Sequence, residues 1–197
     1  TWGLLTKNPA NGIKKLREYQ VERQIFKPDE IQRLLAVVDY KPLYKLIVVA
    51  LYTGCRLSEL LHLQYCDIDW LENSFIIRNK ASFTTKSGKV RRIPISIKIP
   101  FEWLQSENQQ DYIFRNCKEK QNKKDYMGQL MRKYVQKAGL PKGLTFHCLR
   151  HTFITNLLRK GVSIYIVKKL AGHSDIKTTE IYAHLITDDL KEAVNCL

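Results

Sequence analysis

The 197-residue sequence lacks a long apolar segment. Its longest apolar run, residues 46–52, is far shorter than the roughly 20 residues that a membrane-spanning helix needs. No apolar core of a signal peptide is recognisable either. From these absences we expect a soluble, intracellular protein.

The cysteines lack the spacing of a disulfide framework or a zinc knuckle, because the five of them include no C-x-x-C pair. His147 and His151 have the i, i+4 spacing of a zinc-binding H-E-x-x-H helix. However, Cys148 stands where that motif has glutamate, and no third ligand is evident. We therefore predict no metal site and a reducing compartment.

Acidic residues are scarce: 19 Asp and Glu stand against 33 Lys and Arg, which gives a net charge of +14. Such an excess predicts a polyanionic partner. A basic run is usually a solvated surface, but two runs here flank the chemical motifs, which favours double-stranded DNA. They are Arg78, Lys80, Lys86, Lys89, Arg91, Arg92 and Lys98, without an acid among them, and Lys118, Lys120, Lys123, Lys124, Arg132, Lys133 and Lys137.

Apolar periodicity predicts one mainly α-helical domain with a small antiparallel β-sheet (α+β). Pro28 and Pro42 open the first two helices, and Gly54 ends the second in a left-handed cap. Alternating apolar residues between 67 and 95 predict the strands. Later helices are expected at 126–138, 149–158 and 163–170, and Thr178 or Thr179 is expected to cap the helix that carries Tyr182.

Opening a phosphodiester without a metal requires a nucleophile, cations for the charge at phosphorus and an acid for the departing oxygen. The candidates are Tyr182 as nucleophile, Arg56 and Arg150 as phosphate clamps, Lys86 as acid, and His147 and His173 as donors or proton shuttles. Taken singly, each has an ordinary alternative, since a tyrosine usually packs in a core and a lone cation usually lies on the surface. Only the complete set indicates chemistry.

Five ordered segments resemble the tyrosine recombinases of the phage-integrase type. They are TGCRLSEL at 53–60, TKSGK at 85–89 with RRIPI at 91–95, HCLRHTF at 147–153, LAGHS at 170–174 and TTEIYAH at 178–184. The resemblance extends from about residue 27 to residue 184. The family's hairpin lysine can be matched to Lys86 or Lys89, and we favour Lys86 because it precedes the Ser87-Gly88 turn.

The resemblance implies a site-specific recombinase or integrase that cleaves DNA through a 3′-phosphotyrosyl intermediate and needs no cofactor. Tyr182 would attack and His147 would act as its base. Arg56 and Arg150 would hold the phosphate, with Lys86 protonating the 5′ oxygen and His173 contacting a phosphate oxygen. Glu59 would orient Arg56 or a histidine.

The resemblance also implies a domain organisation. Residues 1–26 would be an interdomain linker and the start of the catalytic domain, residues 27–197 the catalytic domain, and a core-binding domain would precede Thr1. The linker would contact DNA through Lys14, Lys15 and Arg17, and the hairpin through Lys89, Arg91 and Arg92. Further expected partners are other protomers in a tetrameric synapse and accessory directionality factors. We expect a prokaryotic or viral setting, in which the protein lies in the cytoplasm with the nucleoid. No membrane partner is expected.

Two alternatives remain at this level. A type IB topoisomerase shares the same chemical residues but rejoins the original ends, so a four-way-junction product would distinguish the two. A DNA-binding regulator with a vestigial site would keep its function without Tyr182.

Overall fold

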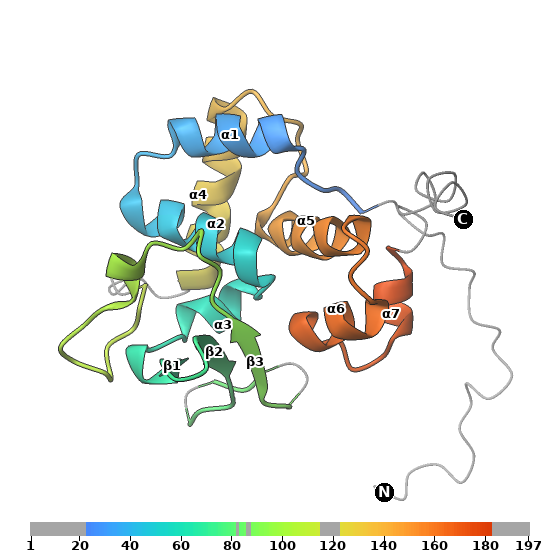
Figure 1. Cartoon of the computed structure of the whole chain (residues 1–197). Helices are drawn as coiled ribbons and strands as arrows, with labels where there is room; N and C mark the ends of the chain where they lie inside the picture. The colour runs from blue at the N-terminus through green and yellow to red at the C-terminus, as the bar shows by residue number, and fades with distance from the viewer. Residues whose placement is uncertain (1–22, 82, 86–87, 115–122, 183–197) are drawn as a thin grey trace, which may run out of the picture.

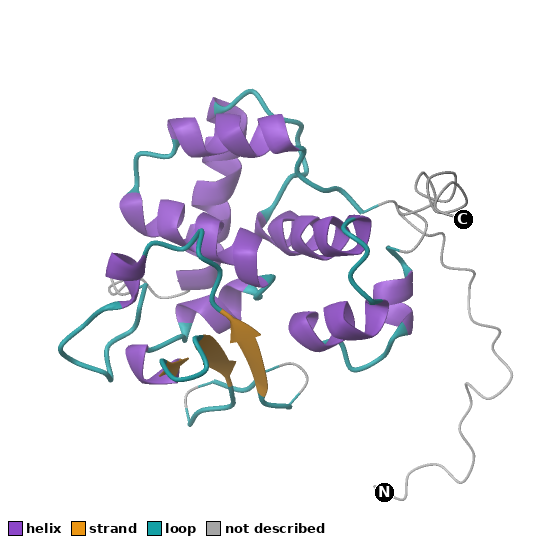
Figure 2. Ribbon diagram, in the orientation of Figure 1, coloured by secondary structure: helices purple, strands orange, loops and turns teal. Residues whose placement is uncertain are grey.

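The computed structural model describes residues 23–81, 83–85, 88–114 and 123–182, which form helices around a three-stranded sheet (Figures 1 and 2). The helices are α1 (Pro28–Val37), α2 (Lys41–Thr53), α3 (Leu57–Leu61), α4 (Lys123–Lys137), α5 (Phe146–Arg159), α6 (Ile164–Ala171) and α7 (Lys177–Glu180), with 3-10 turns η1 (Tyr65–Asp67) and η2 (Phe101–Leu104). The strands are β1 (Ile68–Asp69), β2 (Ser74–Ile77) and β3 (Arg91–Pro94). The predicted fold class is confirmed. Within the described residues, no helix is both long and apolar enough to cross a membrane.

The first two helices begin and end for local reasons. Pro28 opens α1, and the Glu30 carboxylate accepts a hydrogen bond from the Lys27 N–H at 2.8 Å, which satisfies a free donor of the first turn. Gly54 ends α2 with a φ of 63°, and its N–H donates to the Ala50 carbonyl at 2.9 Å. Both boundaries agree with the sequence prediction.

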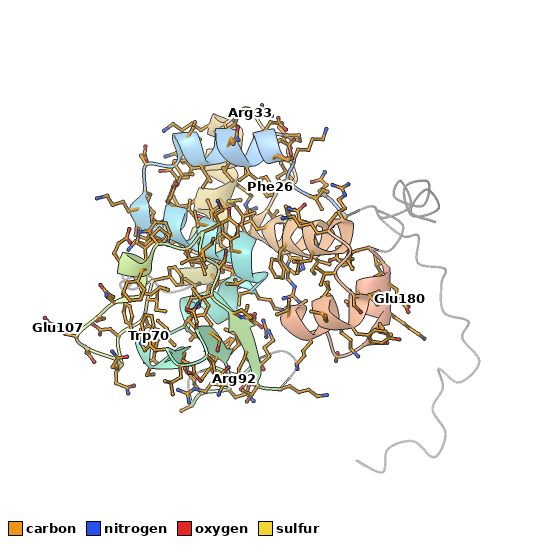
Figure 3. The ribbon with its side chains drawn as sticks, viewed as in Figure 1. Phe26, Arg33, Trp70, Arg92, Glu107 and Glu180 are labelled. Atoms are coloured by element: carbon orange, nitrogen blue, oxygen red, sulfur yellow. The ribbon has the colours of Figure 1, made fainter. Side chains whose placement is uncertain are left out.

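The sheet is antiparallel throughout, in the order β1-β2-β3, with Ser74 opposite Pro94 and Ile77 opposite Arg91. Alternation along β3 buries Arg91 and Ile93 and exposes Arg92, which Figure 3 shows at the outer end of the sheet. Lys86, in the connection from β2 to β3, lies outside the described residues.

Helix α5 joins two apolar clusters. The larger cluster contains residues of α1 to α5 and the sheet. The smaller one lies between α5, α6 and the chain after α7, which Figure 1 shows on one side of the molecule. Its buried members are Phe153, Ile154, Leu158, Val167, Ala171 and Tyr182. Tyr182 is thus an interior residue here.

Several boundaries differ from the prediction. Helix α4 begins at Lys123 rather than at residue 126, and Tyr182 follows α7 instead of lying on a helix. Helix α5 begins at Phe146 rather than at residue 149, because Cys148 closes its first turn by accepting the Thr145 N–H at 3.3 Å and donating its own N–H to the Thr145 carbonyl at 3.0 Å. The predicted cap at Thr178 or Thr179 is wrong. Both residues lie inside α7, and the Thr179 hydroxyl instead contacts the His173 ring at 2.8 Å.

The turn after α2 provides a stability test. A Cβ at Gly54 would lie 2.3 Å from the Phe153 ring, whereas Gly161, with a similarly positive φ, has open space around it. Gly161→Ala should therefore lower the free energy of unfolding by about 1 kcal/mol. Gly54→Ala should lower it by about 2–4 kcal/mol, because overpacking adds to the backbone cost. Urea unfolding measures both, and equal losses would contradict the close contact with Phe153.

Candidate active site

Arg150 lies on α5 with its guanidinium in the interior, only 2% of the residue being exposed. Its Nη1 donates to the Gly54 carbonyl at 2.7 Å, which ties α5 to the turn after α2. Among the described residues, its buried Nη2 has no acceptor. Burial lowers the pKa of Arg150 to about 10, and repulsion from Arg56 adds to this. A buried cationic donor without an acceptor is costly, so this group is prepared to bind an anion.

Arg56 is the residue that precedes α3, where a cation opposes the helix dipole. Glu59 offsets that penalty. Its carboxylate accepts the Arg56 backbone N–H at 2.8 Å and pairs with Arg56 Nη1 at 2.9 Å. The guanidinium remains partly exposed, with 21% of the side chain accessible. Glu59 therefore orients Arg56 in this structure while leaving part of it available to a ligand.

Arg91 requires a correction, because we predicted it as a DNA contact and the structure buries it. Its Nη1 and Nη2 donate to the two oxygens of Glu59 at 3.0 and 2.7 Å, and its Nε donates to the Leu170 carbonyl at 3.1 Å. The physical reason is the alternation of β3, which directs Arg91 inward onto a buried carboxylate. Lys89 and Arg92 are exposed and remain predicted DNA contacts.

The Glu59 carboxylate therefore pairs with two arginines, and their charges also act on Arg150. Burial raises the pKa of Glu59, but hydrogen bonds and charge from Arg91 and then Arg56 outweigh it and hold the pKa below its ordinary value. Glu59 is thus ionised at neutral pH. One negative charge is shared between Arg56 and Arg91, and Arg150 beside them has no carboxylate of its own among the described residues.

His173 follows α6, and its Nδ1 contacts the buried Thr179 hydroxyl at 2.8 Å. Burial lowers the pKa of His173 to about 3, and the positive charges of Arg150, Arg56, Arg23 and Arg91 add to the effect. The ring is therefore neutral at physiological pH. The influence of the arginines indicates that His173 belongs to the same cluster.

Tyr182 is 2% exposed, and its hydroxyl shares a hydrogen bond with Nδ1 of His151. The Arg23 guanidinium lies over the phenol ring, 5.9 Å from its centroid. Burial raises the pKa of Tyr182, and the charges of Arg23 and Arg150 partly offset this. Sequence reasoning considered His151 only as a zinc ligand and missed Arg23 altogether. The i, i+4 spacing of His147 and His151 was the one available signal.

His147 is exposed in the first turn of α5, and its ring meets that of His151 edge to face, with 4.6 Å between centroids. Its predicted role as the base of Tyr182 stays a prediction, as does that of Lys86. The linker residues Lys14, Lys15 and Arg17 also lie outside the described residues. Within the described part of the chain, no group of three His, Cys, Asp or Glu side chains is arranged to hold a metal.

Residues 24–188 match the Phage integrase family. The chain belongs to this family. It is 34% identical over 194 residues to the tyrosine recombinase XerA of Pyrococcus horikoshii, covering 92% of this chain and 65% of that protein. The chain thus spans slightly less than two thirds of the length of that recombinase.

Solved integrase structures have the same fold. The catalytic domain of bacteriophage HP1 integrase superposes with a TM-score of 0.65 at 29% identity, covering 88% of this chain and 95% of that domain. The Tn1549 transposon integrase, in complex with transposon right end DNA, gives a TM-score of 0.69 at 26% identity, covering 98% of this chain and 72% of that one. The mainly helical fold with its small sheet is therefore that of an integrase catalytic domain.

The buried Glu59 carboxylate predicts a pH-dependent stability. Because the folded pKa lies below the unfolded value, its contribution is present above the unfolded pKa and is lost as pH falls through the folded pKa. Glu59→Gln should cost about 3–5 kcal/mol at pH 7, since Arg91 is left buried without its partner, and this difference from wild type should shrink in acid. Urea unfolding between neutral and acidic pH measures it.

Glu107→Gln is the matched control, because Glu107 is exposed and lies across the molecule from Glu180 of α7 (Figure 3). We expect a change within about 0.5 kcal/mol for this variant. A loss for Glu59→Gln no larger than that of the control would contradict the structural role of the ion pair.

Proposed function

We propose that the chain is the catalytic part of a site-specific DNA recombinase that cleaves and rejoins strands through a 3′-phosphotyrosyl intermediate at Tyr182. The observation that carries this proposal is the pairing of two buried groups. One is the Arg150 Nη2, which has no acceptor among the described residues, and the other is the Tyr182 phenol, bonded to a neutral histidine. They supply an anion site and a nucleophile within one electrostatic cluster.

In the cleavage step, the Tyr182 oxygen attacks the scissile phosphorus, the new O–P bond forms, and the bond to the 5′ oxygen breaks. Arg150 and the exposed part of Arg56 hold the non-bridging oxygens, and His173 donates to one of them. Lys86 gives a proton to the departing 5′ oxygen. A 5′-hydroxyl of another duplex then reverses the step, so each phosphodiester is exchanged for another without an external energy source.

A basic cleft supports the proposed path of the DNA backbone. It has a volume of about 530 Å³ between α3, α4 and the start of α5. Its lining includes Arg56, His147, Lys124 and Arg132. A second hollow of about 910 Å³ lies between β3 and α6, with Lys89, Arg92 and Lys168 around His173. We propose that phosphates of the DNA backbone occupy both hollows.

For the whole protein, we propose the organisation expected from the sequence. Residues 1–26 link a core-binding domain to the catalytic domain at 27–197, and Lys14, Lys15 and Arg17 follow the DNA backbone. Four protomers assemble on double-stranded DNA, and accessory directionality factors choose between integration and excision. This activity belongs in the cytoplasm, with the nucleoid. The relatives named above, a tyrosine recombinase and a phage integrase, support the recombinase activity on which this organisation rests.

A nicked suicide duplex carrying the cognate site tests the chemistry. In EDTA, wild type should give a covalent protein–DNA band on a denaturing gel, and Tyr182→Phe should give none while still binding the duplex. A band from both proteins would show that another residue attacks. A four-way-junction product from paired duplexes would favour the recombinase over a type IB topoisomerase, which rejoins the original ends.

Salt dependence tests the cleft. Each phosphate contact contributes about 0.9 to the slope of log K against log salt for duplex DNA. Arg132→Gln should therefore make the slope less steep by about 0.9 and weaken binding to all DNA sequences alike. Lys160→Gln is the control, because Lys160 is exposed just after the opposite end of α5. If both variants left the slope unchanged, the cleft would not hold DNA.

A further inference from the structure

We propose that His151 accepts the phenol proton when Tyr182 attacks, which rests on the proposed function and assigns its base. His151 lies on α5 directly after Arg150, and both it and Tyr182 are buried in the same part of the molecule. Its Nδ1 bonds the Tyr182 hydroxyl, the atom that would form the bond to phosphorus. The resemblance to the tyrosine recombinases instead assigned the role of base to His147, whose exposed ring touches that of His151.

The charge state of His151 suits an acceptor. Burial lowers its pKa to about 3, and His147, Arg23, Arg150 and His173 add to the effect. The ring is therefore neutral at physiological pH, and a neutral imidazole has one nitrogen that accepts. The phenol, whose pKa burial raises, keeps its proton. The hydroxyl can then donate to Nδ1 in the tautomer that carries hydrogen on Nε2.

DNA binding makes this weak base stronger. The charges that suppress protonation of His151 include Arg23 and Arg150. A phosphate held by Arg150 brings a negative charge into the cluster, which offsets their repulsion and favours the imidazolium. Without DNA, the phenol stays neutral, buried and protected. With a phosphate in place, the proton moves to His151 as the O–P bond forms.

The proton balance is complete. The Tyr182 O–H bond breaks and Nδ1 gains that proton, while the 5′ oxygen takes a separate proton from Lys86. In the rejoining step, the attacking 5′-hydroxyl gives its proton back to the Lys86 amine as the new O–P bond forms. The bond between phosphorus and the Tyr182 oxygen breaks, and the imidazolium returns its proton to the departing phenolate. The same residue thus serves both directions, as microscopic reversibility requires.

The segment before α1 holds this pair in place. The Phe26 N–H donates to the Thr152 hydroxyl at 2.9 Å, and Phe26 is buried beside α5 (Figure 3). Thr152 follows His151 directly. This hydrogen bond holds the segment before α1 against α5, next to His151. Arg23, three residues before Phe26, then lies over the Tyr182 ring.

Single-turnover cleavage by His151→Asn tests the assignment, because asparagine can hydrogen-bond but cannot take up a proton. We expect the cleavage rate to fall by about 10²-fold or more, with little change in DNA affinity. The rate should rise with pH as hydroxide replaces the lost base. A duplex with sulfur in place of the bridging 5′ oxygen, whose leaving thiolate needs no proton, should rescue Lys86→Ala but not His151→Asn.

Three comparisons make the test decisive. His62→Asn is the control, since that ring instead bonds the Ser58 carbonyl and stacks on Phe83, and it should cleave like wild type. Cleavage by His151→Asn within threefold of wild type, or rescue by the sulfur substrate, would overturn the assignment and leave the proposed function standing. No covalent product from wild type would instead refute the function itself.

A measurement on the wild-type protein covers the case in which the variant does not fold. Nitrogen-15 spectra of the histidine rings should show Nδ1 of His151 without hydrogen at neutral pH, and its signal should move in Tyr182→Phe. A hydrogen on Nδ1 in wild type would exclude the phenol as its donor and would overturn the proposal.

Discussion

The ion pair between Glu59 and Arg91 is the constraint on which the site depends. It joins α3 to β3 through two hydrogen bonds, and Arg91 continues to the Leu170 carbonyl at the end of α6. The same carboxylate holds Arg56. The buried Glu59 carboxylate and its partner Arg91 therefore fix the relative positions of α3, β3 and the end of α6, which lie far apart in the sequence. Gly172 completes the junction, because a Cβ there would lie 2.9 Å from the Arg91 guanidinium. His173 follows directly, so its position depends on the same pair.

Three consecutive residues of helix α5 contact three different parts of the structure. Arg150 points a buried guanidinium at the turn after α2, His151 bonds the Tyr182 hydroxyl, and Thr152 accepts the N–H of Phe26. Successive residues of a helix point about 100° apart, so one turn reaches three neighbours at once. This arrangement explains why the helix belongs to both apolar clusters and why the phenol can be buried yet remain bonded to a polar partner.

Much of the fold was readable in the sequence, because prolines, glycines and apolar periodicity act locally. Pro28 and Gly54 mark helix ends that the structure confirms. The burial of Arg91 could not be predicted, because Arg91 and Arg92 are both basic. Which of the two points inward becomes clear only when the position of β3 in the sheet is known. The contact of His151 with Tyr182 was not readable, because the two residues lie 31 positions apart in the sequence. Arg23 carried no signal, since its position depends on how the chain before α1 packs on α5.

Exposure alone would favour Tyr165 as the attacking residue, because Tyr165 is 70% exposed on α6 and Tyr182 is 2% exposed. We propose that the buried Tyr182 attacks, and peptide mapping of the trapped protein–DNA complex identifies the attacking residue. After nuclease digestion, we expect a nucleotide joined through its 3′ phosphate to the peptide that contains Tyr182. An adduct on any other residue would contradict it.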